Sequence, residues 1–326
     1  MNSRNYTIKT QSAISKPKNS PVILAALAIL IAALGVPALA QTFSNWSAPE
    51  NLGSPINTTA FEGGPFISRD GLDLFITSNR GVGGTSPNDI YVSHRETREY
   101  HWGSPVSLGS DINTPEFTEG FPFLTSDGHY LYFISNRPGG CGGFDFYVSR
   151  RLNFHNFTEW STPQNLGCQV NSIGVELAPS VFEAEDGTVY LYFSSGLRPG
   201  GMGFGDIYVS QLQADGTFGA PNPISELNTT SNDIHITIRV PDGLEIFFIS
   251  NRPGSMENSP DLYTSTRPCS DCHWSAPVNL GPLVNSNSIE GGPKLSSDGT
   301  ELYFMSNRPG GSGDQDLYVI RRERLD

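Results

Sequence analysis

Short apolar runs separated by polar turns make up most of this chain. The most regular runs are rich in aromatic and aliphatic residues and occupy 72–76, 130–134, 189–193, 244–248 and 301–305. Each follows an Asp-Gly pair, at Asp70, Asp127, Asp186, Asp242 and Asp298. Runs of this composition are typical of strands, and Asp-Gly between two of them indicates a hairpin. The sequence after residue 41 shows no sustained helical period.

The same pattern occurs five times. An acidic residue recurs at a spacing of 57 residues, as Glu62, Glu119, Glu176, Asp233 and Glu290. Each copy begins with a large aromatic residue, at Trp46, Trp102, Trp160, Phe218 and Trp274. A fixed period indicates a repeat architecture. Residues present in every copy are expected to build the repeat, whereas residues present in one copy are better candidates for chemistry.

Each copy predicts four short strands, A to D: the acidic segment, the aromatic run, an Asp-aliphatic-Tyr segment, and the segment led by Trp or Phe. Four antiparallel strands per repeat are typical of a β-propeller, so we predict an all-β, five-bladed β-propeller of four-stranded antiparallel blades. The chain starts with a D segment and stops after a C segment. We therefore expect the N-terminal strand to complete the last blade and close the ring.

The first 40 residues have the features of a secretory signal peptide. Four basic residues precede an apolar run over 22–34, and Ala38-Leu39-Ala40 provides a small-x-small cleavage site. We expect cleavage after Ala40, which leaves a propeller domain over 41–326. The alternative is an uncleaved membrane anchor, for which the apolar run is short. The sequence thus predicts an exported protein, periplasmic or extracellular, with no membrane span after cleavage.

The acidic composition limits the partners of the domain. The net charge of the chain is −13, and removal of the four basic leader residues makes it −17. Nucleic acids and anionic lipids require a cationic face, so we exclude nucleic acid as a partner. A protein or a carbohydrate remains as the expected ligand, and the acidity is compatible with bound cations.

Two of the copies resemble a known repeat. Asp298-Gly-Thr-Glu-Leu-Tyr-Phe-Met-Ser-Asn-Arg-Pro-Gly-Gly311, followed by Asp316-Leu-Tyr-Val, is similar to the repeat of TolB-type, WD-repeat-like propellers, and so is the segment that starts at Asp127. The resemblance covers nearly all of 46–326 and implies the propeller fold. It implies little about function, because such propellers occur as binding platforms, in envelope complexes and beside enzyme domains. This chain lacks the N-terminal domain of TolB, and TolB-type rings usually have six blades.

An arginine and an aspartate flank the loop between strands B and C in every copy. They are Arg80 and Asp89, Arg137 and Asp145, Arg198 and Asp206, Arg252 and Asp261, and Arg308 and Asp316. An ion pair, or an aspartate that accepts from loop N–H groups, would hold the loop closed. The functional alternative makes Arg80, Arg137, Arg198, Arg252 and Arg308 a ligand-binding ring for an anionic glycan.

The five repeated acids are a candidate metal site. Glu62, Glu119, Glu176, Asp233 and Glu290 open the strands that line the central channel, so they could converge at one mouth and bind Ca²⁺. The alternative, which we favour, is that each acid bonds to backbone amides of the neighbouring blade and none meets the axis, because symmetric repetition usually serves structure.

The four cysteines fall outside the repeat. Cys141, in a B–C loop, and Cys168, after a D strand, are expected on the same face of one blade and could form a disulfide. Cys269-Ser-Asp-Cys272-His273 matches the attachment pattern of c-type haem. A local Cys269–Cys272 disulfide is the favoured alternative.

The favoured function from sequence alone is a non-catalytic, exported scaffold that binds a protein or a glycan on its loop face. The sequence contains no nucleophile elbow. The alternative is a carbohydrate-active hydrolase or lyase with acids at the channel mouth. That chemistry needs two carboxylates in different environments, about 5–9.5 Å apart. Acids without a repeated partner, such as Glu116, Glu183, Glu185 and Asp314, form no recognisable motif.

Overall fold

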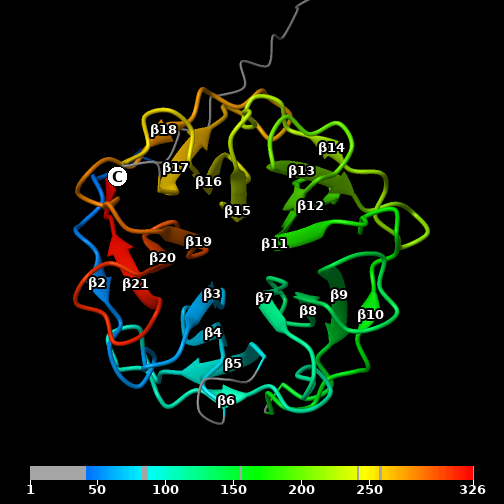
Figure 1. The fold of residues 1–326 in the computed structure, drawn as a ribbon, viewed down its shortest axis with the longest axis horizontal. Coiled ribbons are helices and arrows are strands. Elements are labelled where there is room, and N and C mark those ends of the chain that lie inside the picture. The colour runs from blue at the N-terminus through cyan, green and yellow to red at the C-terminus, as the bar shows by residue number, and fades with distance from the viewer. Residues whose placement is uncertain (1–41, 82–86, 155, 241, 257–258, 326) are drawn as a thin grey trace, which may run out of the picture. The chain divides into compact units, whose positions relative to one another are not determined.

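Five antiparallel sheets, each of four strands, are arranged around a ring (Figure 1). The computed structural model describes residues 42–81, 87–154, 156–240, 242–256 and 259–325. The predicted leader, 1–40, lies outside these residues. The prediction of an all-β, five-bladed propeller with four-stranded blades is confirmed. None of the described residues belongs to a helix with the length and apolar character needed to cross a bilayer.

The blades follow one another along the chain, with strand A innermost (Figure 1). The first blade contains β3 (Glu62–Ile67), β4 (Asp73–Ser78), β5 (Asp89–His94) and β6 (Val106–Ser107). The second contains β7 (Glu119–Leu124), β8 (Tyr130–Ser135), β9 (Asp145–Arg150) and β10 (Gln164–Asn165). The third contains β11 (Val175–Glu183), β12 (Val189–Gly196), β13 (Gly205–Gln211) and β14 (Asn222–Pro223).

The fourth blade contains β15 (Asp233–Ile238), β16 (Glu245–Ser250), β17 (Asp261–Thr266) and β18 (Val278–Asn279). The fifth contains β19 (Glu290–Leu295), β20 (Glu301–Ser306) and β21 (Asp316–Arg321), and its outer strand is β2 (Glu50–Asn51). Two further short strands, β1 (Thr42–Phe43) and β22 (Arg324–Leu325), pair with each other.

The outer strands are much shorter than the Trp-led segments that predicted them, at two residues each. A proline precedes or ends the paired residues, for example Pro49, Pro105 and Pro163. Because proline has no backbone N–H to donate, it restricts the ladder at this edge. A glycine with positive φ, such as Gly109 (84°), then turns the chain toward the next blade.

The inner strands share a bulge near the ring axis. In all five blades, two residues of strand A are left out of the pairing with strand B. They lie between Gly63 and Phe66 in the first blade and between Leu177 and Ser180 in the third. One bulge residue in each blade has positive φ: Gly64, Phe121, Ala178, His235 and Gly292. Three of these are not glycine, so packing must stabilise a conformation that costs them about 1–2 kcal/mol.

The bulges nearly fill the centre of the ring. The cavity bounded by Gly64, Phe121, Ala178, Gly292 and their neighbouring prolines has a volume of about 20 Å³. This is room for about one water molecule. A substrate therefore has no space in this part of the axis, and the candidate sites lie between the blades instead.

Candidate functional site

The five repeated acids are buried within their own blades. In the second blade, Ser135 Oγ donates to Glu119 Oε1 at 2.7 Å and Arg137 Nη2 donates to the same oxygen at 3.1 Å. The backbone N–H of Thr114 donates to Oε2 at 2.7 Å. Equivalent arginine–acid pairs are Arg80–Glu62, Arg198–Glu176, Arg252–Asp233 and Arg308–Glu290. The structure thus brings each acid to an arginine of its own blade, rather than to the other acids or to the neighbouring blade as expected. Among the described residues, no group of three or more His, Cys, Asp or Glu side chains could hold a metal ion.

The five arginine heads are occupied by bonds within the protein. Besides Glu119, Arg137 donates from Nη2 to the carbonyl of Ile112 at 2.6 Å and from Nε to Ser135 Oγ at 3.0 Å. The sequence-based expectation of ion pairs between these arginines and the aspartates of strand C is wrong. The register between strands A and B explains the actual partner. Glu119 lies opposite Ser135, and Ser135 comes two residues before Arg137 in the sequence.

In four blades the aspartate that opens strand C accepts a hydrogen bond from the B–C loop, which was the alternative considered: Asp145, Asp206, Asp261 and Asp316. Asp316 Oδ2 accepts from the backbone N–H of Ser312 at 2.6 Å and from Asn51 Nδ2 at 2.9 Å. Burial and the nearby Glu119 raise the pKa of Asp89, at the equivalent position of the first blade, to about 6, and burial also raises the pKa of Asp261.

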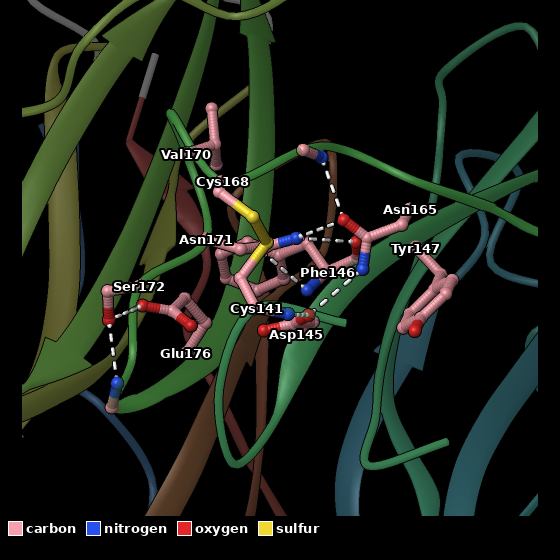
Figure 2. Close-up of a disulfide and its surroundings, with 12 residues drawn as sticks. Cys141, Asp145, Phe146, Tyr147, Asn165, Cys168, Val170, Asn171, Ser172 and Glu176 are labelled. Carbon is pink, nitrogen blue, oxygen red and sulfur yellow. Dashed lines mark hydrogen bonds between the residues drawn. A yellow bond between two sulfur atoms is a disulfide. The ribbon is translucent and has the colours of Figure 1, made fainter. Parts of the chain in front are cut away.

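The four cysteines form two disulfides, each within one repeat. Cys141 bonds Cys168, and Figure 2 shows this bridge beside Asp145, which accepts from the N–H of Cys141. Cys269 bonds Cys272 in the loop between β17 and β18. A thioether link to haem would require both of these sulfur atoms, which here bond to each other.

A second repeated arginine was missed in the sequence. Arg95, Arg267 and Arg322 follow strand C in three blades, and their guanidinium groups lie 4.2–4.4 Å from the rings of Trp102, Trp274 and Trp46. In all three, Nε donates to the carbonyl of the glycine in the Asp-Gly turn. The sequence does contain a pattern that identifies these residues: an arginine occurs six residues after the strand C aspartate in four of the five copies.

The fourth such arginine, Arg151, has different contacts from the other three. Its guanidinium group lies 4.3 Å from the ring of Phe157, and Nη2 donates to the carbonyl of Phe154 at 3.1 Å. Its Nε is buried and has no hydrogen-bond partner among the described residues. The residue is only 7% exposed. A buried donor without an acceptor is costly unless something else occupies the site, so Arg151 marks the adjacent cavity as a candidate binding site.

That cavity lies between the first and second blades and has a volume of about 490 Å³. Phe66, Leu124 and Phe154 form its apolar lining, and Asp73, Asp127 and Arg151 are among the charged residues that line it. We call it the blade 1–2 cavity. Its lining thus combines aromatic and aliphatic side chains with several charged groups, and both kinds of side chain contribute to ligand sites.

Two carboxyl groups in the blade 1–2 cavity have opposite electrostatic environments. Burial raises the pKa of Asp73, and its hydrogen-bonding contact with His94 Nδ1, at 2.7 Å, offsets this only in part. Burial also opposes ionisation of Asp127, but hydrogen bonds from Thr125 Oγ1 and the N–H of His129 outweigh it and lower its pKa. The cavity therefore combines one carboxyl group whose pKa is raised with another whose pKa is lowered.

Burial lowers the pKa values of two basic residues near the ring axis. Burial lowers the pKa of His235 to about 4, and His235 Nδ1 accepts from the N–H of Gly292 at 3.3 Å. Burial lowers the pKa of Lys294 to about 7. Its Nζ lies 4.5 Å and 4.1 Å from the rings of Phe66 and Phe123, which favour the charged form and fix its position.

Comparison with known proteins extends the description of the fold. No family model matches the chain, and no curated protein matches it. The TolB-type resemblance therefore stays a prediction. Solved structures do share the fold. A GH62 hydrolase in complex with xylotriose is 11% identical with a TM-score of 0.56, and the match covers 87% of this chain and 99% of that one.

Two further structures are similar. An alpha-L-arabinofuranosidase from Lactobacillus brevis is 14% identical with a TM-score of 0.55, over 82% of this chain and 92% of that one. An endo-arabinase from Bacteroides thetaiotaomicron is 15% identical with a TM-score of 0.55, over 88% of this chain and 99% of that one. At these identities the similarity shows the fold alone.

These matches correct the function expected from sequence. The prediction of a non-catalytic scaffold that is not an enzyme is wrong by this comparison, because the similar structures are mostly glycoside hydrolases. The physical reason for the error is that repetition drew attention to equivalent acids. The two unequal acids, Asp73 and Asp127, lie in different copies and at different positions of the repeat.

Proposed function

We propose that the protein is an exported glycoside hydrolase whose active site is the blade 1–2 cavity. The observation that carries the proposal is the pair of unequal carboxyl groups, Asp73 and Asp127, in one cavity. Glycoside hydrolysis uses two carboxyl groups with separated pKa values, one as general acid and one as base or nucleophile. The fold shared with glycoside hydrolases supports this reaction class.

The roles follow from the environments. Asp73 holds a proton more readily and would protonate the oxygen of the leaving sugar. Asp127 is the ionised group and would activate water or attack the anomeric carbon. Arg151 would donate from Nε to a sugar hydroxyl, which would satisfy its unpartnered buried donor. The ring of Phe154, which is 47% exposed, would contact the apolar face of a sugar.

The substrate class is proposed from the structural neighbours. One was solved with xylotriose, and two others are described as an arabinofuranosidase and an endo-arabinase. We propose pentose-containing glycans as substrates. Export fits such substrates, because polysaccharides lie outside the cell membrane.

The test is a reducing-end assay of the full chain on arabinan, arabinoxylan and xylan, with Asp73→Asn/Asp127→Asn as the control. We expect sugar release by the wild type and none above background by the double variant. Equal release by both proteins would show contaminating activity. No release from any of the three glycans would count against the proposed substrate class and site.

We also propose that β2 closes the ring by pairing with β21. The support is the register, in which Asn51 lies opposite Tyr318, and the hydrogen bond from the N–H of Leu52 to the carbonyl of Leu317 at 3.0 Å. Cysteines introduced as Asn51→Cys and Tyr318→Cys should form an intramolecular disulfide under mild oxidation, visible by peptide mass spectrometry. The off-register control is Asn51→Cys with Leu317→Cys. Equal cross-linking of both pairs, or cross-linking only between molecules, would contradict closure.

A further inference from the structure

A second and larger cavity lies between the fifth and first blades. Its volume is about 840 Å³, and it is lined by residues of the β5–β6 link, the start of β20 and the N-terminal segment before β2. We call it the blade 5–1 cavity. It is separate from the blade 1–2 cavity, but the two lie on either side of the Asp-Gly turn of the first blade. Arg98 lines the blade 5–1 cavity and donates from Nε to the carbonyl of Asp70, which lines the other.

An arginine and a glutamate stand apart in this cavity although their repeat equivalents are tightly bonded. Between the fourth and fifth blades, Arg322 forms a bidentate pair with Glu245, at 2.9 Å and 2.6 Å. Arg95 and Glu301 occupy the same repeat positions between the fifth and first blades. There, Arg95 Nη2 is 3.7 Å from Glu301 Oε2, which is too far for a hydrogen bond.

The open pair leaves a buried donor unsatisfied. Arg95 is 4% exposed, and its Nη2 has no hydrogen-bond partner among the described residues. Stacking on Trp102 and the bond from Nε to Gly71 fix the guanidinium group in position, so it cannot move to find a partner. Tyr303 Oη donates to Glu301 Oε2 and Arg321 Nε donates to Glu301 Oε1, both at 3.1 Å. Its carboxylate retains acceptor capacity, because it has about four lone-pair sites.

The chemistry of the cavity indicates a neutral polyol. Four arginines and four glutamates line it, so the lining has no net charge to attract an ion of either sign. A donor and an acceptor held side by side match two neighbouring hydroxyl groups, one accepting from Arg95 and the other donating to Glu301. Tyr100, which is 60% exposed at the rim, offers a flat apolar face of the kind that contacts the C–H groups of a sugar ring.

We propose that the blade 5–1 cavity is a binding site for a neutral sugar, which holds a vicinal diol between Arg95 and Glu301 and stacks on Tyr100. This inference does not depend on hydrolysis in the blade 1–2 cavity. Because the two cavities flank one turn, the site would anchor a glycan near the proposed active site and increase its local concentration.

The test separates binding from hydrolysis by using Asp73→Asn/Asp127→Asn as the background. Calorimetric titration of this full-length variant with xylotriose should show binding, and digalacturonic acid should bind at least about tenfold more weakly. Adding Tyr100→Ala should raise the Kd for xylotriose about tenfold, because stacking on the ring is lost. Tyr130→Ala, which removes a 43% exposed tyrosine elsewhere, is the matched control and should leave the Kd unchanged.

Glu301→Gln provides an independent measurement, since it keeps the shape of the side chain and removes its charge. We expect weaker binding with the same melting temperature as the background variant within a few degrees. Unchanged affinity in both Tyr100→Ala and Glu301→Gln, or tighter binding of the acidic sugar, would overturn the inference. Binding lost in these variants while the wild type hydrolyses no glycan would support the sugar site and count against the proposed function.

Discussion

Asp127→Asn should reduce hydrolysis by about 10²–10⁴-fold on every substrate, whereas Asp73→Asn should do so only on substrates with a poor leaving group. The difference follows from the roles assigned to the two carboxyl groups. A general acid is needed when the departing oxygen must be protonated. An aryl glycoside such as the 2,4-dinitrophenyl derivative has a stable leaving group and depends little on that acid. The base or nucleophile is needed in both cases.

The measurement is kcat/KM of both variants on an arabino- or xylo-oligosaccharide and on the matching dinitrophenyl glycoside. Asp127 also caps the Asp-Gly turn of the second blade, so a loss of activity could reflect a loosened turn. Asp186→Asn is the matched control, because Asp186 caps the equivalent turn of the third blade by accepting from the N–H of Thr188 at 2.9 Å. We expect Asp186→Asn to retain activity. A uniform loss in all three variants, or no selectivity of Asp73→Asn for the leaving group, would refute the assignment.

The dependence of the hydrolysis rate on pH tests the same assignment of the two carboxyl groups. Burial raises the pKa of Asp73, whereas hydrogen bonds lower that of Asp127. Activity requires Asp73 protonated and Asp127 ionised, so the rate should rise as pH increases through the pKa of Asp127 and fall as pH increases through that of Asp73. The alkaline limb should therefore be present with the oligosaccharide and weak or absent with the dinitrophenyl glycoside, which does not need the acid.

Arg137→Ala should lower the free energy of unfolding by about 3–5 kcal/mol, because it leaves a buried carboxylate without its charged partner. Glu119 is fully buried and accepts from Arg137 at 3.1 Å. Removal of the arginine leaves a buried carboxylate with only neutral donors. Arg137 also donates to the carbonyl of Ile112, so the variant loses the bond that ties the preceding link to the blade.

Urea unfolding followed by tryptophan fluorescence measures this effect. Arg150→Ala, which removes an exposed arginine at the end of β9, should change stability by less than about 0.5 kcal/mol. The double variant Glu119→Gln/Arg137→Met should recover part of the loss, because no charge remains buried and the amide still accepts from Thr114. If the double variant is as unstable as Arg137→Ala, the loss comes from packing or from the bond to Ile112 rather than from the charge.

The ring of blades was predictable because its signals are local and repeated. Asp-Gly turns, aromatic runs and the 57-residue spacing of the acids each indicate one blade without any knowledge of the others. The partner of the repeated arginines was also within reach. In a hairpin joined at Asp127-Gly128, counting outward from the turn places Glu119 near Ser135 and therefore near Arg137.

The candidate sites were not predictable, because they depend on contacts between blades. Asp73 opens strand B of the first blade, where the second blade has Tyr130, and Arg151 follows strand C of the second. Only the packing of one blade on the next brings them to one cavity. The open pair of Arg95 and Glu301 has the same sequence signature as the closed pair of Arg322 and Glu245. Whether such a pair is free to bind a ligand depends on neighbours such as Arg321 and Tyr303, which a linear pattern does not reveal.

The burial of the acid–arginine pairs should make the stability of the blades insensitive to dissolved salt. Dissolved ions weaken attractions between charges that face water, over a distance of about 8–10 Å at ordinary salt concentrations. Glu119 and its four counterparts have no exposed surface, and each is joined to an arginine of its own blade. Salt has little access to these attractions. The framework of each blade should therefore keep its stability over a wide range of ionic strength, from fresh water to brine.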